Sequence, residues 1–401
     1  MKYQRPLVEV LLQRMQEPRH FMQVLMGPRQ TGKTTALTQA LAQCDIPCHF
    51  ASIDSVLDKG RAWIEREWNY ARAMISNNSP SVVLALDEVQ NVSRWSSVVK
   101  ALWDADARSG IDLRVILTGS SSLMLQSGLT ESLMGRFELI RCPHWSLTEC
   151  RDAFKYTLDD YLTFGGYPGA AALRDDLSRW RNYMQDAIIE ATLSKDVLAL
   201  EAIRKPALLR QLFFLGSAYS GQEVSYKKLL GQLDDAGNVT TLAHYLELLA
   251  HAGLLCGLQK YSQRPLTVRN SSPRLMAYDP SLMAVAFLGA GLDLRADSTR
   301  FGHLVESAVG AYLLARGASE GFDVYWWRDG NYEVDFVIQS GSSVTAIEVK
   351  SGQPKTSGGI YEFIRRNPNA FNIVVGDSSH SLESFLLGKV PLFNKPATGI
   401  A

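Results

Sequence analysis

The feature that most constrains the fold is a loop between a short apolar run, residues 22–26, and a helix-forming segment that starts at Lys33. The loop and the first helical residues read GPRQTGKT from Gly27 to Thr34, which fits the pattern G-x4-G-K-[ST] in full. Glycines let the backbone curl until several N–H groups point inward, and the helix adds its positive end. On a strand–loop–helix this pattern predicts a phosphate-binding site. An ordinary glycine turn is the alternative, and the apolar strand before the loop disfavours it.

Strands and helices alternate over the first 145 residues. The apolar runs that predict strands are residues 22–26, 48–53, 81–86, 113–118 and 137–142. Such alternation favours a parallel sheet with helical crossovers. Because the apolar runs are largely uninterrupted, helices are expected to cover both faces of the sheet. We therefore predict an α/β core with a parallel sheet over residues 1–145.

The end of the strand over residues 81–86 predicts what the loop binds. Asp87 and Glu88 follow that strand directly. We expect Mg·ATP, with Lys33 at the β- and γ-phosphates, Thr34 and Asp87 on Mg²⁺, and Glu88 orienting the attacking water. Ordinary acidic residues at a strand end are the alternative for the Asp-Glu pair. The residues expected around the nucleotide are Gly27, Pro28, Arg29, Gln30, Thr31, Gly32, Lys33, Thr34, Thr35 and Asp87.

Two further residues of this core are candidates for catalysis. Ser120 follows the strand that ends at residue 118, and its hydroxyl could bond the γ-phosphate or the water; a helix N-cap is the alternative role, and both can hold at once. Arg136 lies between a predicted helix over residues 121–133 and the next strand. In ring-forming ATPases of the AAA+ type this junction faces the next subunit's nucleotide, where an arginine can neutralise transition-state charge. A surface arginine paired with Glu131 or Glu138 is the alternative.

The middle of the chain is mainly helical. A helical pattern over residues 147–202 is broken by GGYPG at 165–169, and residues 205–260 read as three helices and a strand. That order is typical of a winged helix-turn-helix. However, its third helix contains no Lys or Arg, whereas a groove-reading helix normally presents several. Lys227 and Lys228 could touch phosphates, and a protein-packing or subunit-contact module remains the alternative.

The last hundred residues contain a second set of acidic residues. Asp335 starts an apolar strand, and Glu348 and Lys350 lie at the end of the next one. Two carboxylates at neighbouring strand ends can share a divalent metal, which lowers the pKa of a bound water and braces a phosphate. Lys350 lies two residues from Glu348 and so emerges on the same face. Glu306, on the preceding helix, is a further candidate ligand, while an inactive scaffold is the alternative.

Taken together, these motifs resemble a known group. The chain looks like the bacterial and archaeal AAA-type ATPases with GPRQTGKT, LDEVQ, TGSSS and GR, followed by a C-terminal domain of unknown function with a nuclease-like end. The likeness includes GGYPG, Lys195-Asp196-Val197, and WWRDG, EVDFVI and IEVKSG near the end. Arg274 and Pro280 depart from the group's usual pattern, a lysine and then Tyr/Phe-x-Asp-x-Gly. The resemblance implies an AAA+-like P-loop ATPase core (1–145), a helical lid (146–204), a winged-helix-like domain (205–290) and a PD-(D/E)xK nuclease-like α/β domain (291–401).

Composition limits the partners and the compartment. Lys+Arg and Asp+Glu number 41 each, so no overall positive field favours nucleic acid, and DNA contact would need a local patch. Five cysteines are few and odd in number, which fits a reducing compartment. The first residues read as an amphipathic helix, and the apolar run at 282–292 is too short to span a bilayer. We expect a cytoplasmic protein without a membrane partner.

Two functions fit these observations. The first is ATP hydrolysis coupled to DNA binding or processing by a homo-oligomeric ring, such as a hexamer, assembled through Arg136. The second is a regulatory ATP-dependent switch that controls a protein partner and carries a degenerate nuclease fold. Glu348 and Lys350 favour the first function. The neutral net charge and the uncharged third helix favour the second.

Overall fold

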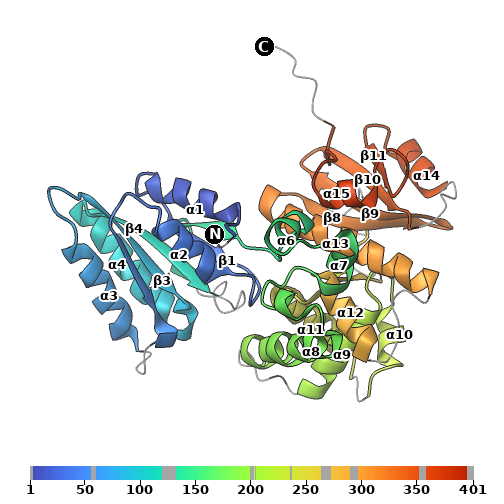
Figure 1. Ribbon diagram of the computed structural model, residues 1–401, viewed down its shortest axis with the longest axis horizontal. Coiled ribbons are helices and arrows are strands. Elements are labelled where there is room, and N and C mark those ends of the chain that lie inside the picture. The colour runs from blue at the N-terminus through green and yellow to red at the C-terminus, as the bar shows by residue number, and fades with distance from the viewer. Residues whose placement is uncertain are drawn as a thin grey trace, which may run out of the picture. The chain divides into compact units, whose positions relative to one another are not determined.

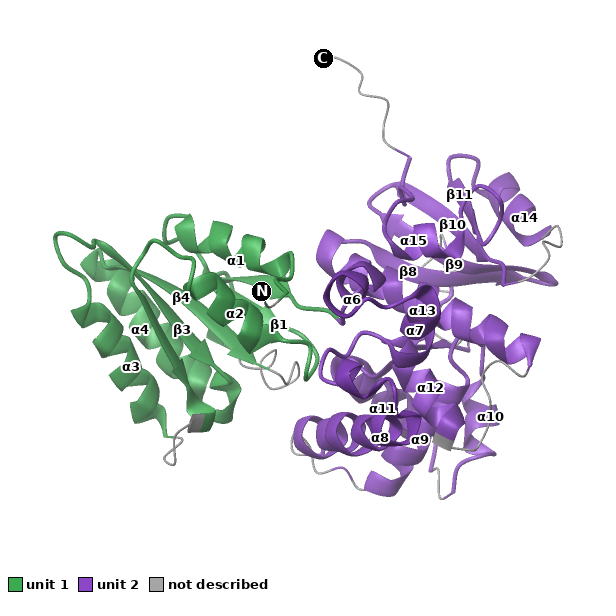
Figure 2. Cartoon of the chain, viewed as in Figure 1, with its two compact units in different colours: residues 1–143 green, residues 144–401 purple. Residues whose placement is uncertain are grey.

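The computed structural model describes residues 3–55, 60–119, 132–198, 203, 205–234, 237–262, 272–289, 297–351 and 358–394. The chain divides into two compact units, residues 1–143 and 144–401 (Figure 2). The division lies close to the predicted end of the core at residue 145. The three segments predicted after the core all fall within the second unit.

The first unit is a parallel sheet with the strand order β2-β3-β4-β1-β5. Its strands are β1 (Met22–Met26), β2 (Cys48–Ser52), β3 (Ser81–Asp87), β4 (Asp112–Gly119) and β5 (Phe137–Arg141). Its α-helices are α1 (Leu7–Gln16), α2 (Lys33–Leu41), α3 (Arg61–Ala73) and α4 (Trp95–Ser109). The predicted α/β fold with a parallel sheet is confirmed. The helix predicted over residues 121–133 lies almost entirely outside the described residues.

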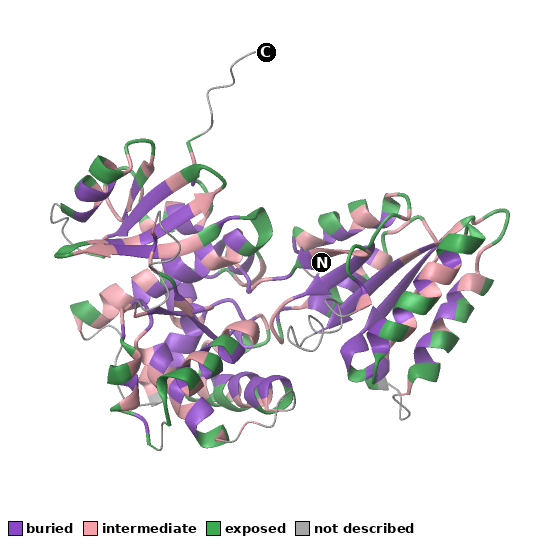
Figure 3. Ribbon diagram, turned by 180° about the vertical axis from the view of Figure 1, so that it is seen from behind, coloured by how far each residue is buried: buried purple, intermediate pink, exposed green. Residues whose placement is uncertain are grey.

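Alternating side chains of the central strands explain why the sheet is covered on both faces. In β3, Val82, Leu84 and Leu86 pack in one apolar cluster, together with tryptophans of α3 and α4. Val83 and Ala85 point the other way, into a cluster formed with α1 and α2. Because successive side chains of a strand face opposite sides, an uninterrupted apolar strand needs a helical layer on each side. The central strands β1, β3 and β4 are accordingly buried along most of their length (Figure 3).

The second unit begins with helices. They are α6 (Leu147–Phe154), α7 (Leu158–Phe164), α8 (Leu177–Tyr183), α9 (Pro206–Ala218), α10 (Tyr226–Leu230), α11 (Val239–His251) and α12 (Pro280–Gly289). A two-stranded antiparallel sheet of β6 (Leu255–Leu258) and β7 (Arg274–Ala277) follows α11. Capping boxes start α6 and α7, with Ser146 and Thr157 as the N-caps. Three helices and a hairpin over residues 206–277 agree with the order expected for this segment.

The unit ends in a four-stranded sheet with the order β11-β10-β9-β8. Its elements are α13 (Ser298–Glu320), β8 (Asp323–Asp329), β9 (Tyr332–Ser340), β10 (Ser343–Val349), α14 (Gly358–Arg366), β11 (Phe371–Val375) and α15 (Leu382–Leu386), labelled in Figure 1. β8, β9 and β10 are antiparallel, and β11 runs parallel to β10 after the α14 crossover. The hairpin is attached to this sheet, because Tyr261 donates its N–H to the carbonyl of Trp326 at 2.7 Å. Over the described ranges, no helix combines the length and apolar character needed to cross a membrane.

Candidate nucleotide-binding site and the C-terminal carboxylate pocket

The phosphate loop joins the end of β1 to the start of α2. Gly32 caps the helix with a φ of 87°, and Gln30 also has a positive φ, 60°. Glycine adopts the left-handed backbone conformation without steric cost. This conformation turns the loop back so that its amides face inward. A Cβ at Gly27 would lie 2.0 Å from the carbonyl oxygen of Cys142. Glycine is thus required where the loop passes the end of β5.

Lys33 lies inside the curl of this loop. Its side-chain amine donates to the carbonyls of Gly27 at 2.9 Å and Pro28 at 2.7 Å, and the residue is only 6% exposed. Thr31 closes the same turn, because its hydroxyl donates to Pro28 at 2.9 Å. The ammonium group is therefore held where the predicted phosphates would lie. A phosphate oxygen would be a stronger partner for it than a neutral carbonyl.

Arg5 supports the loop from outside, and no sequence motif predicts this role. This buried arginine donates to the carbonyl of Thr31 at 2.9 Å and to the sulfur of Cys142 at 3.2 Å. Its other terminal nitrogen donates to the carbonyl of Pro143 at 3.2 Å. The residue thereby ties the phosphate loop to the end of β5. No motif marks it, because its partners are at least 26 residues away in sequence.

Asp87 lies at the carboxyl end of β3, between two hydroxyl groups. One carboxylate oxygen accepts from Thr34 at 3.1 Å, and the other accepts from Thr118 of β4. Burial raises the pKa of Asp87 above its ordinary value; the hydrogen bond from Thr118 opposes this rise, and the charge of Glu88 adds to it. Thr34 and Asp87 thus converge as a hydroxyl and a carboxylate, the oxygen ligands that suit Mg²⁺. Thr118 is a further contributor that the sequence analysis did not select.

Glu88 follows Asp87 with an unusual backbone. Its φ of 56° and ψ of 34° lie in the left-handed region, which is uncommon for a residue other than glycine. Gln90 donates its side-chain amide to the Glu88 carboxylate at 2.5 Å. Strained backbone of this kind clusters at functional sites. The Glu88 carboxylate is thus held by Gln90 directly after Asp87 in the chain, whereas Ser120 lies outside the described residues.

Arg136 lies at the amino-terminal end of the strands, opposite the end that carries the phosphate loop. It precedes β5, and its carbonyl accepts from the N–H of Met22 at the start of β1, whereas the phosphate loop follows the end of β1. Its guanidinium bonds both carboxylate oxygens of Asp104, at 2.8 and 3.1 Å. This partner on α4 differs from the two glutamates considered from sequence. Glu138 instead contacts Arg14, and Glu131 is not among the described residues.

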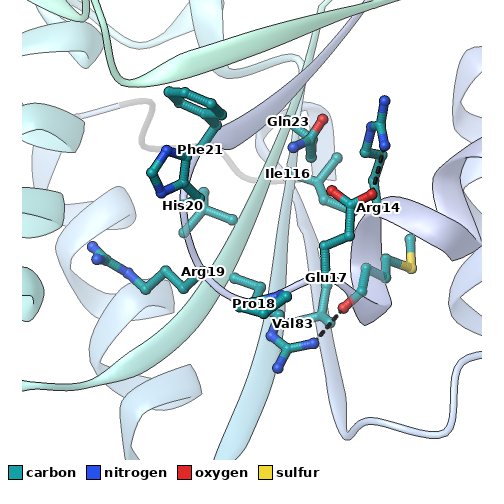
Figure 4. Close-up of a pocket in the computed structure, with 12 residues that line it drawn as sticks. Arg14, Glu17, Pro18, Arg19, His20, Phe21, Gln23, Val83 and Ile116 are labelled. Atoms are coloured by element: carbon teal, nitrogen blue, oxygen red, sulfur yellow. Dashed lines mark hydrogen bonds and ion pairs between the residues drawn. The ribbon is translucent and has the colours of Figure 1, made fainter. Parts of the chain in front are cut away.

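A small pocket of about 30 Å³ lies at the same amino-terminal end of the strands (Figure 4). Arg14, Arg19 and Arg114 line it, together with His20 and Phe21 of the segment before β1. Its arginines are engaged within the chain: Arg14 contacts Glu17, Arg114 contacts Asp112, and Arg19 stacks on a tryptophan ring of α4. The space suits a single water rather than a nucleotide.

The C-terminal pocket brings together all four residues of the predicted metal site. Glu306 of α13, Asp335 of β9, and Glu348 and Lys350 at the end of β10 line an open space of about 440 Å³. Lys350 contacts the Glu348 carboxylate directly. Asp335 accepts from the N–H of Val349 at 2.8 Å. Its pKa is raised to about 6, chiefly by burial, and the positive charge of Arg274 opposes that rise.

Arg274 occupies the position between these carboxylates. Its guanidinium contacts Glu306 at 2.9 Å, Glu333 at 2.9 Å and Asp335 at 3.2 Å, and the residue is 2% exposed. Among the described residues, no group of three His, Cys, Asp or Glu side chains could hold a metal ion. The acidic side chains therefore lie together as expected, but in this arrangement they do not fit a divalent metal.

Comparisons with known proteins agree with a P-loop ATPase domain in the N-terminal part of the chain. Residues 19–151 match a family described as "AAA domain", and residues 155–295 and 301–388 match two families described as domains of unknown function. The uncharacterized protein MJ1544 of Methanocaldococcus jannaschii is 26% identical over 276 residues, 64% of this chain; the match spans only 58% of that relative's length. The uncharacterized protein MJ1637 of the same organism is 23% identical over 400 residues, 88% of this chain and 80% of that protein.

Solved structures show more distant likenesses. A Walker-type ATPase of Pyrococcus abyssi matches with 14% identity and a TM-score of 0.47, over 71% of this chain and 96% of that one. The Aeropyrum pernix ORC1 protein in complex with DNA gives 12% identity and a TM-score of 0.31, over 71% and 92% of the two chains. The RuvB Holliday junction branch migration motor of Thermotoga maritima gives 19% and 0.31, over 62% and 88%.

The phosphate loop, the Asp-Glu strand end and the family match over residues 19–151 lead to one assignment. The N-terminal part of the chain is an AAA-type P-loop ATPase domain, and it is joined to two C-terminal domains of unknown function.

Proposed function

We propose that the P-loop site hydrolyses ATP with Mg²⁺, and the convergence of Thr34, Asp87 and Glu88 carries this proposal. Lys33 would exchange its two carbonyl partners for the β- and γ-phosphates. Thr34 and Asp87 would hold Mg²⁺, which neutralises the charge on the phosphates, and Thr118 would keep the Asp87 carboxylate oriented. Glu88 would orient and polarise the attacking water. Phosphate release by the full chain tests the proposal, with Lys33→Ala as the inactive reference.

The second element of the proposal is an oligomer in which Arg136 serves the nucleotide of a neighbouring subunit. Within its own subunit, β1 separates Arg136 from the phosphate loop, and five residues of strand span about 16 Å. Arg136 therefore cannot reach its own nucleotide. Its present partner does not hold it firmly, because the side chains of Arg136 and Asp104 are 34% and 30% exposed, and exposed ion pairs are weak. An incoming γ-phosphate could take the place of Asp104.

The third element is coupling of hydrolysis to DNA. We propose that DNA contacts the second unit, and the observation in favour is an open pocket lined by the cationic side chain of Lys350. Lys227 and Lys228 lie in the last turn of α10, in the predicted winged-helix segment. The test is the ATPase rate with single-stranded, duplex and branched DNA, together with DNA binding measured against salt concentration. Unchanged rates and no binding at low salt would exclude this element and leave the ATPase proposal intact.

A regulatory switch is the second candidate, and Arg274 is the observation that favours it. The carboxylates of the C-terminal pocket are bonded to a guanidinium rather than arranged for a metal. In that case ATP binding would rearrange the second unit to control a protein partner, and no cleavage would occur. Nucleotide-dependent capture of a partner, without any effect of DNA on the ATPase rate, would favour the switch.

A further inference from the structure

The C-terminal pocket has the acidic residues expected of a metal site, yet the cation that bonds three of its carboxylates is a buried side chain of the protein itself. We propose that the guanidinium of Arg274 is the resident cation of this pocket and takes the place of a divalent metal, so that the second unit binds neither Mg²⁺ nor Mn²⁺ there and does not cut DNA. This inference concerns residues of the second unit alone. It stands or falls independently of ATP hydrolysis and of DNA binding.

The shape of the guanidinium explains how one side chain can serve three carboxylates. One terminal nitrogen bonds Glu333, and the other bonds both Glu306 and Asp335. These donors have fixed directions in one plane, which a lysine ammonium cannot reproduce. Both oxygens of Asp335 are then hydrogen-bonded, because the second one accepts the N–H of Val349. Mg²⁺ requires oxygen ligands at about 2.0–2.1 Å in an octahedron, so it could enter only by displacing these bonds.

The charges around the pocket also leave little attraction for a metal. Each carboxylate of the pocket already contacts a positive side chain: Arg274 serves three of them, Lys350 contacts Glu348, and Arg328 contacts Glu333 in addition. Burial alone would lower the pKa of Arg274, but its carboxylate partners raise that pKa above its ordinary value. The guanidinium therefore remains charged at every physiological pH. These three cations offset most of the charge of the four carboxylates, so a dication placed here would gain little net attraction.

The backbone around Arg274 keeps this cation in place. All four residues of β7 are buried, and β7 pairs with β6 along its whole length. On its other side, Leu275 donates to the carbonyl of Gln222 at 2.9 Å and accepts from the N–H of Gly221 at 2.9 Å. The cation thus comes from the hairpin, whereas the carboxylates come from α13 and β9. A strand bonded on both sides leaves Arg274 no route out of the pocket by local motion alone.

The test measures Mn²⁺ binding by electron paramagnetic resonance, using the full-length chain without nucleotide. The wild type is expected to bind no Mn²⁺ that depends on Asp335, so Asp335→Asn should leave the signal unchanged. Arg274→Met removes the charge and keeps much of the side-chain volume, and it should gain one Mn²⁺ per chain. That gain should disappear in the double variant Arg274→Met, Asp335→Asn. Wild-type Mn²⁺ binding that Asp335→Asn abolishes would overturn the proposal, as would a folded Arg274→Met that binds no Mn²⁺.

Arg274→Met removes the guanidinium from three carboxylates, of which Glu333 keeps Arg328, and losing one partner of a buried ion pair is strongly destabilising. Arg274→Lys is the matched control, because it keeps a positive charge in the same position and is expected to bind no Mn²⁺. Mn²⁺ should raise the Tm of Arg274→Met while leaving that of the wild type and of Arg274→Lys unchanged. If Arg274→Met does not fold, the wild type alone decides. Mn²⁺-dependent nicking of labelled DNA by the wild type, abolished in Lys350→Ala, would refute the inference.

Discussion

Asp87 and Asp335 are buried aspartates at strand ends, and their neighbours give them different roles. Burial raises the pKa of both. The partners of Asp87 are the neutral hydroxyls of Thr34 and Thr118, whereas Asp335 bonds Arg274 and the backbone N–H of Val349. A hydroxyl can turn its hydrogen away and offer oxygen to a metal, but guanidinium and N–H groups can only donate. The partners of Asp87 are thus compatible with the proposed Mg²⁺, whereas those of Asp335 support the proposal that its pocket binds no metal.

The arginines of the two units differ in the same way. Arg136 bonds one carboxylate at the surface, and about a third of its side chain is exposed. Arg274 bonds three carboxylates and is almost fully buried. Exchanging one partner at the surface costs little, while leaving a buried charge unpaired costs several kcal/mol. An arginine that acts on a neighbouring subunit needs an exposed, exchangeable partner. An arginine that takes the place of a metal needs buried partners that hold it.

The largest expected effect tests whether Arg136 is exchangeable. Arg136→Ala should lower ATP turnover by about 10³- to 10⁵-fold, the range known for arginines that stabilise phosphoryl transfer in trans. Mixing it with Lys33→Ala should restore part of the activity, because some interfaces then pair an intact loop with an intact arginine. Asp104→Asn is the control: it removes the partner and should leave turnover near the wild-type rate. A protein that stays monomeric with slowly hydrolysed ATP analogues, and shows no recovery on mixing, would disprove the trans role.

Substitution of Glu88 is expected to have the next largest effect on ATP turnover. It should slow the hydrolysis step and leave ATP binding unchanged. Glu88→Gln should bind ATP with unchanged affinity, since Lys33, Thr34 and Asp87 remain. Turnover should fall by about 10²- to 10⁴-fold, because the water loses its base and orienting group in the transition state. Fluorescent-nucleotide titration and single-turnover hydrolysis separate the two quantities. Turnover near the wild-type rate would show that another group orients the water.

The sequence predicts the first unit well because its signals are local. The phosphate loop, the apolar strands and the Asp-Glu pair each lie within a few neighbouring residues, and the fold they predict is confirmed. Contacts between distant segments were not predictable. Arg5 bonds Thr31, Thr118 bonds Asp87, and Arg136 bonds Asp104, over separations of 26 to 32 residues. Each of these depends on how strands and helices pack, which no local pattern specifies.

The second unit shows the same limit more sharply. The spacing of Asp335, Glu348 and Lys350 indicates a shared pocket, and the structure places them in one. The sequence shows an arginine at position 274, where the group that the chain resembles usually has a lysine. It does not show that this arginine lies among the carboxylates. Residues 59 to 61 positions away from Arg274 meet it only because its long side chain reaches from β7 to carboxylates of β9. A charge that decides the chemistry of a pocket can thus come from outside the motif that marks it.

A matched pair of substitutions tests the comparison of the two aspartates directly. Asp87→Asn should lower ATP turnover by about 10²- to 10³-fold, because the Mg²⁺ that would neutralise phosphate charge in the transition state loses a proposed ligand. Asp335→Asn should leave ATP turnover without DNA unchanged, since its partners lie in the second unit. Phosphate release by both purified variants, with circular dichroism to confirm folding, gives the result. Equal losses in the two variants would mean that the pocket contributes to hydrolysis.

Asp279 is expected to show the smallest effect, and it concerns only how stability depends on pH. Its hydrogen-bond partners are neutral, like those of Asp87, but no metal is proposed to bind it. It is fully buried and accepts from the N–H groups of Gly166 at 2.7 Å and Ser281 at 3.0 Å, which attaches the GGYPG turn to the start of α12. Burial raises its pKa from 3.8 to about 6, against the effect of these hydrogen bonds. Across that window the folded chain keeps a proton at Asp279 that the unfolded chain releases, so the free energy of unfolding falls as the pH rises.

The shift from 3.8 to about 6 corresponds to about 2–3 kcal/mol between the ends of this window. Asp279→Asn keeps the shape and cannot ionise, so its unfolding free energy should lack this decrease. The measurement is the difference in urea unfolding free energy between wild type and Asp279→Asn at about pH 4 and about pH 7, in which the contributions of other titrating groups cancel. The wild type should lose stability relative to the variant as the pH rises. A difference independent of pH would mean that the carboxyl is ionised throughout and that its N–H partners fully offset the cost of burying its charge.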